Sequence, residues 1–363
     1  MTVDRDLLRE LCLCPAPSGF EGNVQDLLRG RLAGGPGEVG ADAIGNLWAS
    51  VGPPDGPSVV AIAHADEIGL IVTHVDDDGF VRFDVVGWLD HQLLPGHTLL
   101  VHARQGVVRG IVGRPPTHLV PEAERGKAPA VNEQYLDIGA RSRDEALGLV
   151  AVGDPLTFDQ GFDELTPGRV VGRALDDRAG VYAVVRALVS LTDDSGGARY
   201  TAISSAHEET TCMGAKALGH RLRPACVFVV DGDFASDYPD VDPAKLGGRV
   251  RLGAGPVLGF GTSTNRKLTE LALEVAASEG IGVQTKAYPG RLLTDAEELA
   301  AAGDAASLAL SIPMRYMHST AEVADERDIE DTARLIVALT RRLGEVFEPG
   351  MFTPGAGLRP AAT

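Results

Sequence analysis

The strongest constraint on the fold of this chain is an alternation of apolar strand-like runs with helix-like runs, which one stretch of purely strand-like segments interrupts. The alternation continues from residue 178 to residue 343. It predicts an α/β fold with a mostly parallel sheet and helices on both of its faces. The expected helices span 178–191, 213–222, 267–279, 295–303 and 328–343, and the expected strands span 200–205, 225–230 and 309–312.

The part of the chain before residue 72 is expected to join the same sheet. Helix-like runs at 4–14 and 22–32 precede an apolar run at 58–75, which predicts two strands with a short break between them. From about residue 72 the chain changes to short strand-like runs, such as GFVRFDVVG and HTLLVHARQGVVRGIVG, with Gly and Pro between them. This pattern is typical of a small all-β module inserted into another domain.

The predicted domain organisation follows from these patterns and from the chain length. A chain of 363 residues is too long for one ordinary hydrophobic core. The predicted units are an α/β domain in two parts (1–71 and 163–350), an inserted β-barrel-like domain (72–162) and a flexible tail (351–363).

The composition excludes several classes of partner. The net charge is −18 and the isoelectric point is about 4.9, which argues against nucleic acid and anionic membranes as partners. Four cysteines are too few for a disulfide scaffold and are expected to be free or structural thiols. The N-terminal segment is charged and amphipathic, unlike a signal peptide, and no apolar run reaches membrane-spanning length. We therefore expect a cytoplasmic protein.

Clusters of His, Asp or Glu stand at five places, each at or just after an apolar strand-like run. In a parallel α/β sheet the carboxyl ends of the strands line one crevice, so these clusters are expected to converge there. The five are AIAHADEIG (His64, Asp66, Glu67), GRALDDRAG (Asp176, Asp177), SSAHEET (His207, Glu208, Glu209), VFVVDGDFASD (Asp231, Asp233) and MRYMHSTAE (His318).

Each cluster on its own also has an ordinary structural explanation. An Asp at the end of a strand commonly caps the next helix, as Asp231 or the pair Asp176–Asp177 would do. His207 with Glu208 can be a surface pair. It is the meeting of five such clusters at one edge of the sheet that favours a metal site.

The charges at this edge favour two metal ions over one. If His64, Asp176, Glu209, Asp231 and His318 are the ligands, three carboxylates and a bridging hydroxide carry about four negative charges, which two divalent ions balance. Imidazole and carboxylate ligands suit Zn²⁺ first, and Co²⁺ or Mn²⁺ as well. One of two adjacent glutamates can then bind metal, while the other lies near the metal-bound water, where a general base is needed.

The motifs that carry these residues resemble those of the dinuclear-metal aminopeptidases of metallopeptidase family forty-two. AHADEIGLIV, LDDRAG, HEETTCMGA and SIPMRYMHST occur in the family's order, and the inserted module matches through LPGHTLLVH, LDIGARSRDEA and VGDPLTFD. The similarity covers nearly the whole chain. The family includes the TET and glutamyl aminopeptidases, and some members carry a cellulase or endoglucanase label.

The resemblance implies a role for each residue of the site. Asp176 would bridge the two metals, His64 and Asp231 would complete one site, and Glu209 and His318 would complete the other. The two catalytic assignments are Glu208 as the general base and Asp66, which can share one side of a strand with His64, as the residue that orients its ring.

The resemblance also implies features of the backbone and of the assembly. In this family the peptide bond after the bridging Asp is often cis, so Asp176–Asp177 is expected to be cis. The inserted β-domain looks like the family's dimerisation module. Its dimers often form tetrahedral dodecamers, so a homo-oligomer is expected.

The implied function is an aminopeptidase that removes N-terminal residues from short peptides through a metal-bridging hydroxide. The alternative is a metal-dependent amidohydrolase or deacylase that uses the same site on another small amide, because such a hydroxide does not require a free amine. An endoglucanase normally needs aromatic platforms for sugars, and 5% aromatic residues do not favour it. A non-catalytic assembly scaffold would be expected to have lost part of the ligand set.

Departures from the family pattern concern the substrate. His207 stands where the family usually has Gln, and YPGRLLTDA occupies a stretch that is often rich in glycine. The predicted substrate contacts in and beside this stretch are Arg291, Leu292, Leu293 and Asp295. The two leucines favour an apolar N-terminal residue such as Leu, whereas the arginine would attract an acidic one such as Glu.

Overall fold

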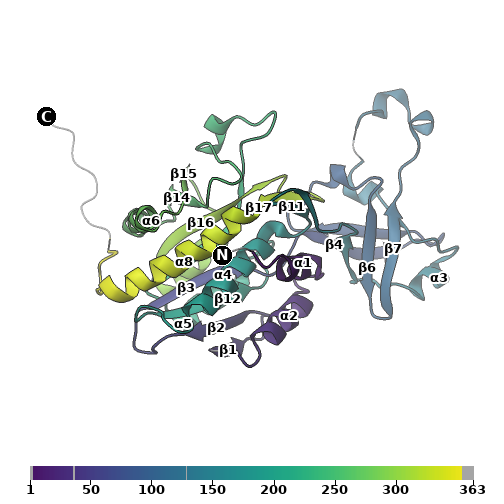
Figure 1. Cartoon of the computed structure of the whole chain (residues 1–363). Coiled ribbons are helices and arrows are strands. Elements are labelled where there is room, and N and C mark those ends of the chain that lie inside the picture. Colours follow the sequence, from purple (N-terminus) through teal and green to yellow (C-terminus); the bar gives the residue numbers. More distant parts are fainter. Residues whose placement is uncertain (1–2, 36, 128, 354–363) are drawn as a thin grey trace.

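The chain forms an α/β body and a separate β-barrel that projects from one side of it (Figure 1). The computed structural model describes residues 3–35, 37–127 and 129–353. The predicted fold class is confirmed, because the body has a mostly parallel central sheet with helices on both faces and the inserted segment forms a small antiparallel barrel.

The large sheet is built around four parallel strands. Its strands are β1 (Glu38–Ala41), β2 (Leu47–Val51), β3 (Ser58–His64), β10 (Asp163–Thr166), β11 (Arg169–Gly172), β12 (Arg199–Ser205), β13 (Cys226–Phe234), β14 (Val257–Gly261), β15 (Gln284–Tyr288), β16 (Ala306–Arg315) and β17 (Glu322–Asp325). The order is β1-β2-β12-β3-β13-β16-β17-β11-β10, with β14 and β15 attached beside β16. Because β12, β3, β13 and β16 are parallel neighbours, their carboxyl ends lie at one edge of the sheet.

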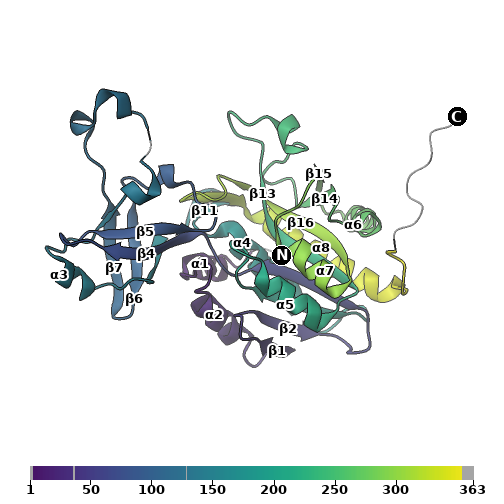
Figure 2. The same ribbon diagram turned by 180° about the vertical axis from the view of Figure 1, so that it is seen from behind.

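Helices cover both faces of this sheet (Figures 1 and 2). They are α1 (Arg5–Leu13), α2 (Gly22–Leu32), α4 (Leu175–Leu191), α5 (Met213–Leu222), α6 (Arg266–Glu279), α7 (Asp295–Gly303) and α8 (Glu326–Val346), with the 3-10 helix η5 (Pro243–Leu246) in a loop. Buried residues of α1, α2, α4, α6 and α8 share one core cluster, and those of α5 and α7 share another. The predicted helices all form, and α2, α5 and α7 have the predicted bounds.

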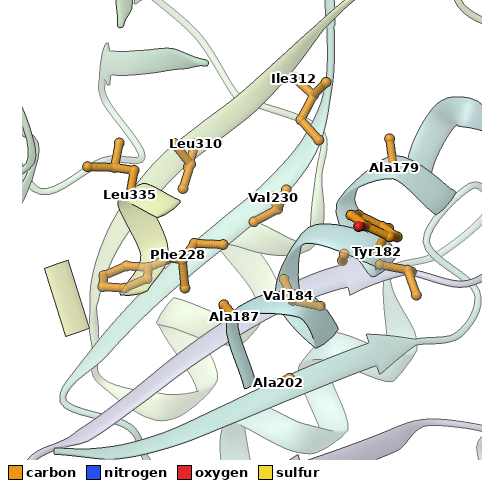
Figure 3. Packing of buried hydrophobic residues seen from close by; sticks show 14 of the residues in the cluster. Ala179, Tyr182, Val184, Ala187, Ala202, Phe228, Val230, Leu310, Ile312 and Leu335 are labelled. Atoms are coloured by element: carbon orange, nitrogen blue, oxygen red, sulfur yellow. The ribbon is translucent and has the colours of Figure 1, made fainter. Parts of the chain in front are cut away.

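Strand β13 shows why the central strands are apolar on both sides. Phe228 and Val230 belong to the cluster beneath α4 and α8, whereas Val229 belongs to the cluster beneath α5 and α7. In Figure 3, Tyr182 and Val184 of α4 lie over this first face. Since alternate residues of a strand point to opposite faces, a strand buried on both sides is apolar throughout, and each buried side chain of this size contributes about 1.5–3 kcal/mol.

The barrel has a hydrophobic core of its own. It closes in the order β4-β5-β8-β7-β6-β9. Its elements are β4 (Gly69–Val75), β5 (Val81–Val86), η1 (His91–Leu93), β6 (Thr98–Ala103), β7 (Gly106–Val112), η2 (Thr117–Leu119), η3 (Glu122–Glu124), η4 (Val131–Glu133), β8 (Leu136–Asp137), α3 (Arg143–Leu147) and β9 (Pro155–Phe158). The predicted domain limits of 72 and 162 stay a prediction, and the first of them falls inside β4.

Two further expectations concern the end of the chain and membranes. Phe352 is buried in the core cluster of the body, and its carbonyl accepts a hydrogen bond from Asn265. The first residues of the predicted flexible tail are therefore anchored to α6, and residues 354–363 lie outside the described chain. Over the described ranges, no helix combines the length and the apolar character needed to cross a membrane.

Candidate metal centre

The five predicted metal ligands meet at the carboxyl edge of the parallel strands. His64 is the last residue of β3, and Asp231 lies near the end of β13. Glu209 follows β12 and His318 follows β16. Asp176 lies at the start of α4, and the peptide bond that joins it to the next residue is cis, as the resemblance implied. The order of the strands thus brings together residues that are up to 254 positions apart.

Asp176 lies between the two histidines. Its Oδ1 is 3.6 Å from Nε2 of His64, and its Oδ2 is 3.3 Å from Nε2 of His318. Glu209 lies on the His318 side, with Oε2 3.4 Å from that ring nitrogen. Asp231 lies on the His64 side, with Oδ1 3.8 Å from Nε2. Asp176 thus lies between two sets of possible ligand atoms. Its Oδ1 faces the set of His64 and Asp231, and its Oδ2 faces the set of His318 and Glu209.

The donor set fits divalent cations. Within the described chain, Asp176 Oδ1 and Glu209 Oε1 are buried and have no hydrogen-bond partner. A buried, unpaired carboxylate oxygen is costly, and a bound cation offsets that cost. One donor atom each from His64, Asp176 and Glu209 lie within 4.8 Å of one another, and the same holds for His64, Asp177 and Asp231.

Asp177 belongs to the group formed with His64 and Asp231, but its hydrogen bonds differ from those of Asp176. Its Oδ2 accepts the backbone amide of His64 at 3.2 Å, and its Oδ1 accepts the amide of Gly180 at 3.0 Å. Both oxygens are therefore engaged by the backbone. Asp177 supports the end of β3, where His64 lies, whereas Asp176 keeps free acceptor capacity.

The protein groups alone leave this site crowded with negative charge. Burial raises the pKa of Asp231 well above its usual range, and the charge of Asp176 raises it further. Burial and the charge of Asp231 likewise raise the pKa of Glu208. Burial lowers the pKa of His318, but hydrogen bonds to Asp176 and Glu209 raise it more, to about 11. The clustered carboxylates therefore need positive charge nearby, and bound metal ions supply it.

Comparison with known proteins identifies the family. The sequence model of the M42 glutamyl aminopeptidases matches residues 45–335, which include the ligand positions described above. The chain belongs to the M42 glutamyl aminopeptidase family. It is a metal-dependent aminopeptidase, a hydrolase of peptide bonds.

Relatives of this M42 aminopeptidase match it over nearly their full length. A lysyl aminopeptidase of Pyrococcus furiosus is 33% identical over 358 residues, 97% of this chain and 100% of the relative. The crystal structure of a TET aminopeptidase from a marine sediment archaeon has a TM-score of 0.88 at 30% identity and covers 93% of this chain and 96% of that one. The TET1 peptidase of Pyrococcus horikoshii, described as assembling into a tetrahedron or a large octahedral shell, has a TM-score of 0.83 at 32% identity and covers 93% and 98%.

Asp66 positions the M42 site in a way that the sequence only partly indicated. The ring Nδ1 of His64 lies 3.1 Å from the backbone carbonyl of Asp66 and 3.6 Å from its carboxylate. The carboxylate instead accepts the backbone amides of Glu208 and Glu209. Asp66 therefore holds the turn that carries Glu208 and Glu209, and its backbone carbonyl also contacts the ring of His64.

Glu322 is a positioning residue that the sequence analysis missed. It is 2% exposed, and its two carboxylate oxygens accept the backbone amides of Asp176 at 2.9 Å and His318 at 3.0 Å. His318 has a φ of +60°, a conformation that a non-glycine residue adopts only when its surroundings hold it there. The only signal in the sequence was an acidic residue at the start of the short strand β17.

A pocket of about 920 Å³ opens onto the metal centre. Glu208, whose side chain is 9% exposed, lines it, and its Oε2 is 4.0 Å from Nε2 of His64. The indole of Trp88, 82% exposed, also lines this pocket, and it comes from the loop that follows β5 of the barrel. The barrel thus contributes to the walls of the site although the five predicted ligands come from the body.

The predicted substrate contacts divide into two groups. Arg291, Leu292 and Leu293 line the pocket. Asp295 does not belong to the described lining, because it is 2% exposed and accepts a hydrogen bond from the hydroxyl of Ser205. Its carboxylate, at the start of α7, is held by Ser205 in this structure, and its contact with substrate stays a prediction.

Proposed function

We propose that this M42 aminopeptidase binds two divalent cations and removes N-terminal residues from short peptides. One cation would be held by His64 and Asp231, the other by Glu209 and His318, with Asp176 shared. The observation that carries this proposal is the position of Asp176, which has one oxygen facing each histidine, at 3.6 Å and 3.3 Å. When bound, such a pair of ions polarises the scissile carbonyl and makes water a better nucleophile.

The choice of metal follows from the donors. Two imidazoles and three carboxylates suit Zn²⁺ first, and Co²⁺ or Mn²⁺ also satisfy them. Activity that disappears with a chelator and returns with zinc or cobalt, together with elemental analysis giving about two ions per subunit, would support the assignment. Active protein without any transition metal would contradict it.

Glu208 is the proposed general base. Its carboxylate lies in the pocket beside the ligands but not among their closest contacts, and its amide is held by Asp66. Burial raises its pKa, which brings the carboxylate nearer to the proton affinity that a base needs near neutral pH. It would take a proton from the attacking water and pass it to the amine of the leaving peptide.

We also propose that the barrel serves assembly into a homo-oligomer. It closes around its own core, its strands lie outside the proposed ligand set, and the P. horikoshii relative is described as assembling into a tetrahedron or an octahedral shell. A dimer would be the building block, and a tetrahedral dodecamer of about twelve times 38.0 kDa the closed form. Light scattering after size exclusion tests this, and a fully active monomer would contradict it.

A cytoplasmic location stays a prediction, to be tested by cell fractionation.

The activity itself is best tested with a panel of chromogenic amides. Aminoacyl amides with a free amine should be hydrolysed by the metal-loaded protein. Acylated amino acids and a soluble cellulose derivative, run beside them, should not be. Cleavage of the acylated substrates with no cleavage of the free-amine substrates would replace the aminopeptidase by an amidohydrolase that uses the same site.

A further inference from the structure

A buried ion pair forms one wall of the active-site pocket. Nζ of Lys286 lies 2.5 Å from Oδ1 of Asp233, and the hydroxyl of Tyr288 donates to Oδ2 of Asp233 at 2.8 Å. Lys286 is 6% exposed and Asp233 is 4% exposed, yet both line the pocket. Because both charges are removed from bulk water, their pairing determines the charge that this wall presents to a substrate.

The pair lies directly beside the metal centre. Asp233 comes two residues after the ligand Asp231 on β13, so both side chains point to the same face of the sheet. Lys286 and Tyr288 are likewise two residues apart on β15. The ammonium group of Lys286 also lies over the rings of Tyr288 and Phe234, at 5.1 Å and 5.9 Å from their centroids. Its charge is therefore compensated from several sides.

The floor of the pocket is apolar. Val229 precedes Asp231 by two residues on β13, and it pairs in register with Ala309 of β16. Both are buried, and both line the pocket. Leu292, another lining residue, packs against the cluster that contains Val229. A substrate side chain that extends past the metal ligands toward these residues contacts aliphatic carbon atoms.

The two other lysine and arginine side chains in the described lining of the pocket are exposed. Arg291 has a side chain that is 66% exposed, and it already pairs with Glu297 and Glu298. Lys245 belongs to η5 and is exposed to water, where its field is weakened by solvent and salt. Neither offers an acidic substrate a buried positive partner comparable to the one Lys286 would offer without Asp233.

We propose that this pocket accepts an uncharged, apolar side chain of the N-terminal residue, and that Asp233 sets this preference by neutralising Lys286. The inference rests on the proposed aminopeptidase function. An apolar side chain gains by leaving water for the floor formed by Val229, Ala309 and Leu292. An acidic side chain would have to lose its hydration without a free lysine or arginine to pair with in the described lining, because Lys286 is already paired with Asp233.

The variant Asp233→Asn tests the proposal directly. It keeps the shape of the side chain and an oxygen that Tyr288 can donate to, but it removes the carboxylate that pairs with Lys286. The wild type should prefer a leucyl over a glutamyl amide by at least about tenfold in kcat/KM, the size of discrimination that pocket contacts provide. In Asp233→Asn the glutamyl-to-leucyl ratio should rise by at least about tenfold.

A double variant separates charge from distortion. Asp233→Asn combined with Lys286→Met carries neither charge, so its glutamyl-to-leucyl ratio should return toward that of the wild type. Distortion of the neighbouring ligand Asp231 would not be reversed in this way. Metal content measured in each variant, and inhibition constants for free leucine and free glutamate, give readouts that do not depend on turnover.

Further variants keep the proposal testable if Asp233→Asn does not fold. Leu292→Ala should lower the leucyl rate relative to the alanyl rate by about tenfold, since it shortens the apolar floor. Arg266→Ala, at an exposed position of α6 outside the pocket, is the control and should leave the ranking unchanged. A wild-type preference for glutamyl amides, or an unchanged ratio in metal-loaded Asp233→Asn, would overturn the proposal. Failure to hydrolyse any aminoacyl amide would instead overturn the proposed function.

Discussion

The carboxylate of Asp66 accepts the backbone amide of Glu208 at 3.1 Å through Oδ1. Its other oxygen accepts the amide of Glu209 at 3.0 Å. One buried side chain just after β3 thus fixes two consecutive peptide groups that follow β12, and these carry the proposed base and a proposed ligand. The different roles proposed for the adjacent glutamates depend on this contact, because it fixes the two peptide groups from which their side chains extend.

Replacing Asp66 should therefore impair both glutamates. Asp66→Asn puts an amide donor opposite one of the two backbone donors, so one hydrogen bond is lost. We expect metal affinity and turnover each to fall about 10- to 100-fold, as is usual for partners that orient metal ligands. Metal titration and steady-state kinetics measure these effects. Asp26→Asn, at an exposed position on α2, is the control and should change neither.

The variant Glu208→Gln should keep its metals but lose most of its turnover. The amide cannot accept the proton, and the loss expected for a missing general base is about two to four orders of magnitude. Elemental analysis and kinetics on the same preparation check this. Retention of most of the activity, or an empty metal site, would show that Glu208 has another role.

The variant Glu209→Gln should show the opposite pattern. Glu209 faces His318 at 3.4 Å and has a buried oxygen without a partner in the described chain, so its charge is expected to serve a cation. The variant should lose metal occupancy, and added metal should restore part of the activity. If the variant kept its full metal content but had no turnover, Glu209 would be the general base and Glu208 the ligand.

Metal affinity should rise with pH. The pKa of His318 is raised to about 11 by its carboxylate neighbours, so near pH 7 the ring carries a proton that a cation must displace. The raised pKa values of Asp231 and Glu209 act in the same direction at lower pH. Each displaced proton makes the affinity change by up to about tenfold per pH unit. Calorimetric titration in buffers of different ionisation enthalpy counts the protons, and zero release near pH 7 would contradict the prediction.

Glu322 should matter for metal binding although it is not a proposed ligand. Glu322→Gln places an amide donor against the backbone donors of Asp176 and His318, and we expect unfolding to become easier by about 1–3 kcal/mol. Metal affinity should fall as well, because both ligands lose their backbone support. Absorption of the cobalt-loaded protein reports the ligand geometry, and Glu345→Gln, at an exposed position of α8, is the control. An unchanged cobalt spectrum with full affinity would reduce Glu322 to a purely structural residue.

Local patterns were sufficient to predict the helices and the four parallel central strands of the α/β body. Helices such as α5 and α7 and the buried strand β3 have apolar residues at the spacing of their own secondary structure. The local sequence of each element is therefore enough to predict it. The short outer strands were missed, since four or five residues carry little information about secondary structure; they are β1, β2, β10, β11, β14, β15 and β17. Such strands form because a neighbouring strand supplies hydrogen-bond partners, as Arg169–Gly172 does for β17.

The sequence by itself was enough to propose the ligand set, because metal ligands cluster at strand ends and a parallel sheet brings those ends to one edge. Residues that act through the backbone were beyond its reach. Glu322 holds the amide of Asp176, 146 positions away, and any buried acidic residue has the same appearance in a sequence. The charge of the pocket was decided by tertiary structure in the same way. Asp233 and Lys286 are 53 positions apart, and Asp233 neutralises Lys286 only because β13 and β15 bring the two side chains to one wall, where burial makes their pairing obligatory.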